Sequence, residues 1–447
     1  MQPPSTLILN ATVVNEGQLQ QYDVLLQHGR ISRLEADLQH IRAEHIIDAT
    51  GLHLFPGMID DQVHFREPGL TGKGDIATES AAAVAGGITS YMDMPNVQPA
   101  TVTNQALADK QQLARQKSLA NYAFYLGATN HNIDEIKAVD SSSVCGIKVF
   151  MGASTGNLLV NEPAALEQIF RESPILIATH CEDNDVITRN TGLARQQYGE
   201  QVPVTAHPVI RSSEACYLSS SYAVELARRF NSNLHVLHIT TARELSLFEP
   251  GPLANKRITA EACVHHLWFS DQDYPVLQNQ IKCNPAIKTA ADRTALLAAI
   301  ADGRIDIIAT DHAPHTLAEK QLPYLQAPAG LPLVQHPLLM LLELHHRQQL
   351  TLPLIARKTA HNPAIRYNIQ QRGFIREGYF ADLVLADLQQ TTTVTPQSIR
   401  YKCGWSPLAG QQFHAAIAAT FVNGYQVFNG QQVLPNPFAA QPLFFCR

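Results

Sequence analysis

The chain contains 447 residues, of which 45% are hydrophobic and 16% are charged, and its formal net charge is −6. This composition indicates a globular protein with a large core and excludes a disordered chain. No long basic run is present, which argues against nucleic-acid binding and against a polybasic membrane segment. No apolar stretch reaches the about 20 residues that a membrane helix needs, and residues 1–6 lack the pattern of a signal peptide.

Seven cysteines are scattered along the chain, at positions 145, 181, 216, 263, 283, 403 and 446. Their number is odd and none forms a Cys-x-x-Cys pair, which argues against a structural zinc site made of cysteines. We expect reduced, mostly buried thiols and a cytoplasmic location.

Both ends of the chain carry short strand patterns separated by turns. The first set lies at residues 7–9, 12–14, 24–26, 31–34 and 45–47, and the second at 381–385, 418–422 and 425–428, with Asn423-Gly424 as a hairpin turn. Each set alone has little apolar surface to bury. We therefore predict that residues 1–55 and 366–447 pair into one small β-sandwich domain.

The middle of the chain alternates between strand and helix patterns. Strand-like runs end near residues 64, 94, 127, 151, 180, 239, 263 and 311, and helical patterns cover 76–85, 104–120, 164–171, 213–230 and 292–300. Such alternation predicts parallel strands, and eight of them in about 300 residues fit an α/β (β/α)₈ TIM barrel over residues 56–365. A doubly wound open sheet is the alternative, but no Gly-x-Gly-x-x-Gly follows the first strand. The Gly-rich segment 152–157 lacks the Gly-Lys-Ser/Thr ending of a nucleotide-binding P-loop.

Residues 60–69 follow an apolar run and place polar side chains at the carboxyl end of a strand, where barrels build active sites. Alternate residues of a strand point the same way, so Gln62, His64 and Arg66 should share one face. Two histidines and an arginine in this spacing would supply two metal ligands and an anion clamp. This chain has Gln62 at the first of these positions.

Lys148 lies among Ile, Val and Phe in the fourth strand pattern. A buried cation is costly unless it is paired or neutralised, so two interpretations are open. The lysine forms a salt bridge, or its amine adds CO₂ to give a carbamate whose two oxygens bridge two metal cations.

His180 and His238 each end an apolar strand, and Asp311 ends the last one. A single such histidine is more often a hydrogen-bonded core residue. The two histidines together with Asp311 and Lys148 favour a Zn²⁺ site. Asp311 would ligate metal and shuttle a proton, with a helix N-cap as the alternative. His265 and His266 follow the seventh strand and either pack there or support the site from behind.

With these residues assembled, the chain resembles the amidohydrolase superfamily and, within it, the dihydroorotases. The resemblance covers nearly the whole chain and rests on residues 63–69, 94–96, 146–148, His180, His238, 283–285, 309–315, 362–364 and 378–384. It implies that His64, position 62 and Asp311 hold one zinc, that His180 and His238 hold the other, and that N6-carboxylated Lys148 bridges them. It further implies that Arg66, Asn96 and His315 bind a substrate carboxylate, that Asn284 contacts the ring, and that residues 329–332 close on it.

The resemblance implies reversible cyclisation of N-carbamoyl-L-aspartate to L-dihydroorotate in pyrimidine biosynthesis, by a metal-activated hydroxide with Asp311 as the proton shuttle. Another cyclic amidohydrolase activity, of the allantoinase or hydantoinase type, is the first alternative. Arg66 argues against it, because those substrates carry no carboxylate at that place. An inactive scaffold for aspartate transcarbamoylase is the second alternative.

Gln62 departs from the family pattern, which has histidine there. An amide oxygen is a poor zinc ligand, so three outcomes are open: a weakened first metal, a single metal held by His180, His238 and Lys148, or loss of catalysis. Because the other ligands and Arg66 are retained, we expect an active enzyme with one or two Zn²⁺ per chain. We also expect a homo-oligomer, a dimer in the simplest case, with association with aspartate transcarbamoylase as a further option.

Overall fold

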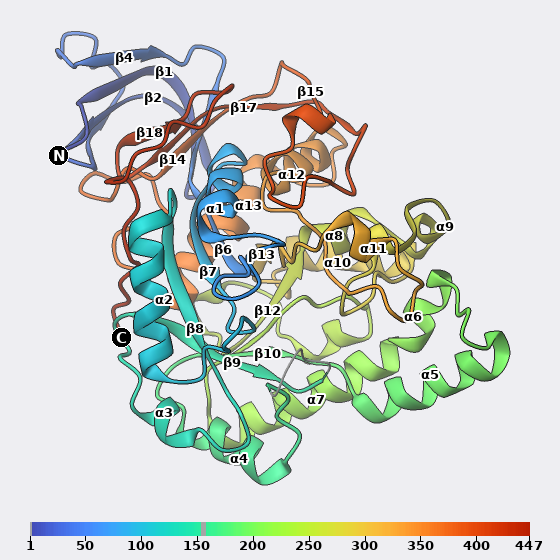
Figure 1. Ribbon diagram of the computed structural model, residues 1–447. Coiled ribbons are helices and arrows are strands. Elements are labelled where there is room, and N and C mark those ends of the chain that lie inside the picture. Colours follow the sequence, from blue (N-terminus) through green and yellow to red (C-terminus); the bar gives the residue numbers. More distant parts are fainter. Residues whose placement is uncertain (1, 153–157) are drawn as a thin grey trace.

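A closed parallel barrel forms the centre of the molecule (Figure 1). The computed structural model describes residues 2–152 and 158–447. Within these residues one eight-stranded sheet has the order β13-β12-β11-β10-β9-β8-β7-β6. Its strands are β6 (Met58–Val63), β7 (Ile88–Asp93), β8 (Asn121–Gly127), β9 (Val144–Phe150), β10 (Ile177–His180), β11 (Leu234–Val236), β12 (Ile258–Cys263) and β13 (Ile307–Ala309). A parallel bridge between Val63 and His312 joins the two ends, which confirms the predicted TIM barrel.

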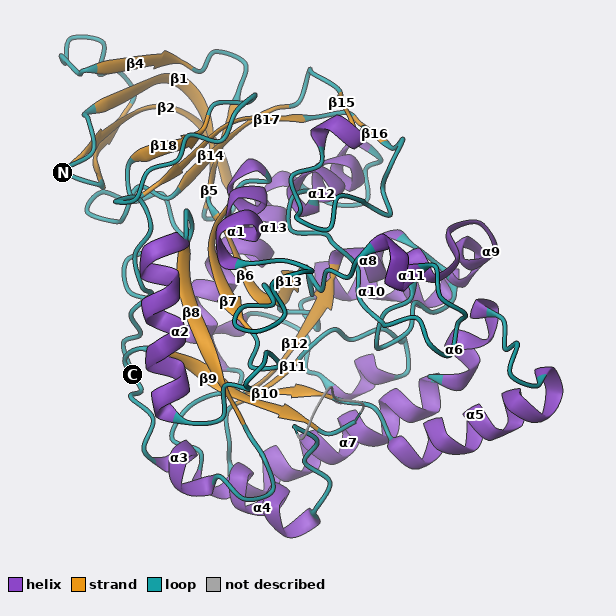
Figure 2. Cartoon of the chain, viewed as in Figure 1, coloured by secondary structure: helices purple, strands orange, loops and turns teal. Residues whose placement is uncertain are grey.

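Helices lie outside the barrel strands (Figure 2). They are α1 (Ile76–Ala85), α2 (Asn104–Lys117), α3 (Ile133–Lys137), α4 (Pro163–Glu172), α5 (Asn184–Tyr198), α6 (His207–Ile210), α7 (Ser213–Phe230), α8 (Val264–Trp268), α9 (Tyr274–Leu277), α10 (Ala290–Asp302), α11 (Leu317–Lys320), α12 (Pro337–His346), α13 (Leu352–Ala356) and α14 (Asn362–Tyr367). The helices expected at 76–85 and 213–230 have those bounds, and the other three differ by one to three residues at an end. Among the described residues, no helix has both the length and the apolar character needed to cross a membrane.

A second sheet joins the two ends of the chain, as the sequence predicts. It has the order β18-β17-β14-β5-β1-β2-β3, with β4 also paired to β1. Its strands are β1 (Thr6–Asn15), β2 (Gln18–Gln27), β3 (Arg30–Glu35), β4 (His45–Asp48), β5 (His53–Pro56), β14 (Leu383–Asp387), β17 (Ala416–Val422) and β18 (Tyr425–Phe428), and β15 (Thr392–Thr393) pairs separately with β16 (Gln412–Phe413). The two termini meet where Leu54 of β5 pairs with Leu385 of β14.

Two local expectations are wrong in detail. Residues 7–9 and 12–14 belong to one strand, because β1 continues through an irregularity in which Asn10 takes a φ of 61°. The first barrel strand ends at Val63, so His64 and Arg66 do not continue it.

Of the Gly-rich segment 152–157, residues 153–157 lie outside the described residues. The cysteines are all free, and five of them are buried, as expected.

Asp382 connects the terminal sheet to the barrel. Its Oδ1 accepts the backbone N–H of Asn423, and its Oδ2 accepts both the side chain of Asn121, at the start of β8, and the guanidinium of Arg372. Arg372 and Asp382 are 3% and 5% exposed, so each charge depends on the other for its stability.

We predict that Asp382→Ala destabilises the protein by about 3–5 kcal/mol, because it leaves the Arg372 charge buried and unpaired. The matched control is Glu214→Ala, which removes an exposed ion pair with Arg189 and should change stability by about 1 kcal/mol or less. Denaturation midpoints of the two variants, measured side by side, test this. Equal midpoints would show that the buried pair contributes little.

Candidate active site

One cavity of about 300 Å³ opens at the carboxyl ends of the barrel strands. Every side chain nominated from the sequence lines it: Gln62, His64, Arg66, Asn96, Lys148, His180, His238, Asn284, Asp311 and His315. The structure thus brings together residues that are up to about 250 positions apart in the chain. Their individual roles remain predictions.

His64, Gln62 and Asp311 meet on one side of this cavity, at the ends of β6 and β13. His64 Nε2 and Gln62 Nε2 each lie 3.1 Å from Asp311 Oδ1. His64 Nδ1 lies 2.7 Å from the Asn96 side-chain oxygen, which accepts its hydrogen. In the neutral imidazole the Nε2 lone pair then faces a carboxylate oxygen. Such a pair is favourable only with a proton or a metal cation between the two atoms.

His180 and His238 form a second pair on the opposite side. His180 Nδ1 lies 3.0 Å from His238 Nε2, and His180 Nε2 lies 3.1 Å from a carboxylate oxygen of Glu182. Glu182 therefore holds the hydrogen on Nε2 and leaves the Nδ1 lone pair directed at His238. Burial lowers the pKa of His180 and lowers that of His238 further, so both rings are neutral and able to bind metal at pH 7.

Lys148, on β9 next to β10, lines the same cavity; it is 1% exposed, with its ammonium 4.6 Å from the ring centre of Phe150. Among the described residues it has no ion pair or side-chain hydrogen bond. Burial lowers its pKa to about 8, although the charges of Asp311 and Glu261 oppose the shift. A substantial fraction of the amine is thus neutral near pH 8, and the neutral amine is the form that adds CO₂. The donor set of imidazoles, carboxylate and a potential carbamate fits Zn²⁺.

A cationic corner occupies the rest of the cavity. Arg66 is 5% exposed and has a φ of 68°; its Nε donates to the Pro314 carbonyl, and its Nη2 lies 3.2 Å from His315 Nε2. Burial lowers the pKa of Arg66 to about 10, so it remains charged at pH 7. It has no ion pair with any described acidic residue. The buried side-chain oxygen of Asn284 also lacks a described hydrogen-bond partner, so this corner offers unsatisfied groups to a ligand.

The Ala329-Gly330 segment closes one side of the cavity. Gly330 has a φ of 135°, and a Cβ built there would lie 2.5 Å from the Ala313 carbonyl oxygen. Only glycine lets the backbone approach this closely. The Gly330 N–H donates to the Lys282 carbonyl, and the Gly330 carbonyl accepts from Lys320 Nζ, which fixes the segment against the barrel.

Sequence reasoning missed Glu182 and Arg211. Glu182 is fully buried, and its pKa is lowered because the charge of Arg211 and the hydrogen bond of His180 outweigh its burial. Arg211 forms an ion pair with Glu182 and lines the cavity. Glu182 stands two positions after His180, beyond the end of β10, so strand alternation does not mark it. Arg211 follows the short helix α6, and nothing in the local pattern marks it.

Comparisons with known proteins show the family and the fold of the chain. The sequence model described as the amidohydrolase family matches residues 53–427. The chain is 33% identical to an allantoinase of Solibacter usitatus, over 96% of this chain and 94% of that protein. It is 32% identical to a dihydroorotase of Halobacterium salinarum, over 92% of this chain and 96% of that protein.

Among solved structures, an L-hydantoinase (dihydropyrimidinase) of Arthrobacter aurescens superposes with a TM-score of 0.94. The superposition covers 99% of this chain and 100% of the hydantoinase chain, at 24% sequence identity. This likeness establishes the fold.

We predict that protein supplied with Zn²⁺ and ¹³C-bicarbonate gives a carbamate ¹³C resonance and that Lys148→Met abolishes it. The matched control is Lys282→Met. Burial also lowers the pKa of Lys282 to about 8, but its ammonium donates to the carbonyls of Tyr324 and Ala327 and is not free to react. The control should keep the resonance. A signal that survives Lys148→Met would place the carbamate elsewhere.

Proposed function

The chain belongs to the amidohydrolase family, and from that premise we propose that it is a Zn²⁺-dependent dihydroorotase that interconverts N-carbamoyl-L-aspartate and L-dihydroorotate. The observation that carries this proposal is the buried Arg66 guanidinium, which has no acidic partner among the described residues and faces the same cavity as the metal-ligand candidates. A substrate carboxylate would complete it, and a guanidinium is well suited to bind one. His315 lies 3.2 Å from the guanidinium, and Asn96 lines the same cavity.

The residues that would hold zinc are His64 and Asp311 on one side, His180 and His238 on the other, and carboxylated Lys148 between them. Zinc bound there would polarise the ring amide carbonyl and activate water. In the hydrolytic direction, water adds to the carbonyl carbon, the C–N bond of the ring breaks, and the ring nitrogen gains a proton.

Asp311 would carry that proton from the attacking water to the ring nitrogen. Burial alone would raise its pKa, but the hydrogen bond and charge of His64 outweigh burial and lower the pKa. Asp311 therefore starts as a carboxylate at pH 7, as a base must. Ring closure uses the same groups in reverse, with Asp311 returning the proton.

Allantoinase activity is the second candidate, because an allantoinase matches the chain about as closely as a dihydroorotase does. The two substrates are both cyclic amides, but allantoin has no carboxylate to pair with Arg66. Turnover of each ring by the purified protein separates the two functions.

We further propose that the protein acts in the cytoplasm as a homo-oligomer. We also propose that it associates with aspartate transcarbamoylase. The free cysteines support the cytoplasmic location. The molecular mass in solution, measured for the protein alone, tests the homo-oligomer. The same measurement after mixing with the transferase tests the association.

We predict that Arg66→Ala lowers kcat/KM for dihydroorotate by roughly 10- to 100-fold, the loss expected for about 1.5–3 kcal/mol of charged hydrogen bonding. Hydrolysis of a cyclic amide without a carboxylate should change little. The control is Arg189→Ala, which alters an exposed arginine of α5. If dihydroorotate turnover is indifferent to Arg66→Ala, or if only allantoin reacts, the dihydroorotase assignment is wrong.

We predict that Gln62→His raises the zinc content by about one ion per chain, because it restores an imidazole beside His64 and Asp311. Elemental analysis of wild type and variant, purified side by side with zinc, gives the measurement. An unchanged content would show that the amide of Gln62 already suffices, or that the first position does not hold metal.

A further inference from the structure

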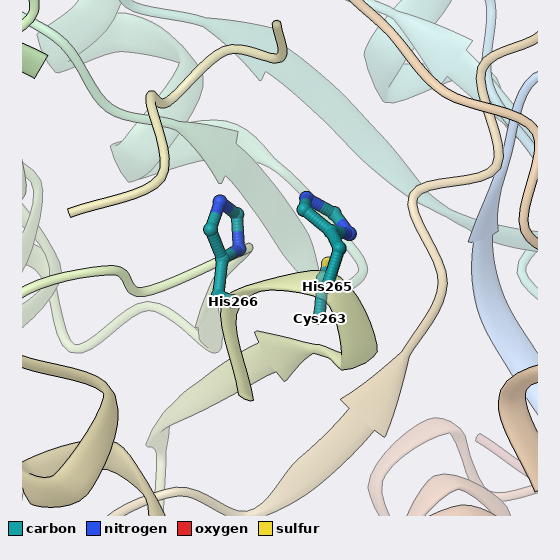
Figure 3. A group of neighbouring side chains, drawn as sticks. All are labelled: Cys263, His265 and His266. Atoms are coloured by element: carbon teal, nitrogen blue, oxygen red, sulfur yellow. The ribbon is translucent and has the colours of Figure 1, made fainter. Parts of the chain in front are cut away.

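A second group of potential metal ligands lies behind the cavity, at the end of β12. Cys263 is the last residue of that strand, and His265 and His266 belong to α8, which follows at once. Their ligand atoms lie within 4.8 Å of one another, and all three side chains are buried. In Figure 3 the two imidazoles rise side by side from α8, with Cys263 below His265.

The imidazoles of this group are unsatisfied. No described group meets full hydrogen-bond geometry with either nitrogen of His265 or with Nδ1 of His266, although the two side chains are at most 3% exposed. The Thr310 backbone is the group that interacts with the His265 ring. A buried polar atom without a partner costs about 1–3 kcal/mol, so three of them call for an explanation. A ligand that binds one lone pair of each ring would satisfy two of these three nitrogens.

The protonation of His266 is fixed by its surroundings. Its Nε2 lies 3.2 Å from the Pro285 carbonyl oxygen, which can only accept, so Nε2 carries the hydrogen. Its Nδ1 is then a bare lone pair. In its neutral form His265 has one nitrogen lone pair, whichever tautomer it adopts.

Cys263 supplies the third atom. Its Sγ lies 3.3 Å from Glu261 Oε1, which can receive the thiol proton, and 3.8 Å from Gln62 Oε1. Metal binding releases the thiol proton, and a carboxylate nearby gives it a destination.

From this geometry we propose that Cys263, His265 and His266 form a separate mononuclear site for Zn²⁺. One thiolate and two neutral imidazoles match the ligand preference of zinc, with a fourth position left for water or a neighbouring oxygen. Ligand atoms around one zinc lie about 3–4 Å apart, so small side-chain rotations suffice to close the group around an ion. The site does not depend on the reaction proposed for the main cavity.

Asp61, His235 and Glu261 form the other ligand-like group in the described residues, and it needs no ion. Burial would lower the pKa of His235, but Asp61 and Glu261 outweigh burial and raise it. The protonated imidazole, 3.3 Å and 3.7 Å from the two carboxylates, already provides the cation. Asp61 Oδ1, His235 Nε2 and Glu261 Oε2 also lack a described hydrogen-bond partner, but the ion pairs already supply the positive charge that a metal would bring.

Cobalt distinguishes this site from the one in the main cavity, because only a thiolate ligand gives a sulfur-to-cobalt charge-transfer band in the near ultraviolet. Apo-protein titrated with Co²⁺ should develop this band, and Cys263→Ser should lose it. Cys181→Ser, which alters another buried cysteine near the cavity, is the matched control and should keep the band. His265→Gln should raise the cobalt concentration needed for half of the band.

The double variant His180→Ala/His238→Ala removes ligands of the main cavity only, so it should retain the thiolate band while losing cobalt bound through nitrogen and oxygen. Absence of the band in the wild-type titration would overturn the proposal. So would a band that persists in folded Cys263→Ser protein, with folding checked by circular dichroism. Neither result bears on whether dihydroorotate is turned over.

Discussion

Closure of the barrel between β6 and β13 is the constraint on which the site depends. The backbone N–H of His64 donates to the His312 carbonyl at 2.7 Å, and Val63 and His312 form the bridge that ends the ring of strands. This contact sets Gln62 and His64 against Asp311. Without it, the polar ends of the first and last strands would face solvent separately. The metal-ligand candidates and the cationic corner would then not line one shared cavity.

A layer of buried polar groups inside the barrel supports that closure. Asp60 accepts both the backbone N–H and the hydroxyl of Thr310, which ties β6 to the end of β13. Tyr367 donates to Asp61 at 2.9 Å, and Tyr125 lies 2.7 Å from Tyr367. Burial and the neighbouring charge of Asp61 raise the pKa of Asp60, even though Thr310 stabilises its charged form. Such buried groups are weak contributors to stability, but they allow few alternative arrangements of the strands.

The cavity divides its chemistry between two sides. Neutral imidazoles, Asp311 and Lys148 occupy the side suited to cations, and Arg66 with His315 forms the side suited to an anion. Burial lowers the pKa of His315 far below its usual value, and the Arg66 charge adds to the shift, so this histidine contributes a neutral ring beside a fixed positive charge. A ring that carries a carboxylate next to its reactive amide matches this separation, whereas a ring without one leaves Arg66 unpaired.

The sequence by itself determined the order of the strands and helices and the polar residues that end the strands, because a period of two or 3.6 residues is a local property of the chain. It therefore identified His64, Lys148, His180, His238 and Asp311 before their positions were known. Only the tertiary structure decided which of them face one another, that Gln62 binds Asp311, and that Arg211 reaches Glu182. It also joined Cys263, His265 and His266 into a group that no cysteine-pair pattern marks. The distances between side chains on different strands follow from the register of the barrel. Which buried polar atoms lack a hydrogen-bond partner follows from burial. Both depend on residues far apart in the chain.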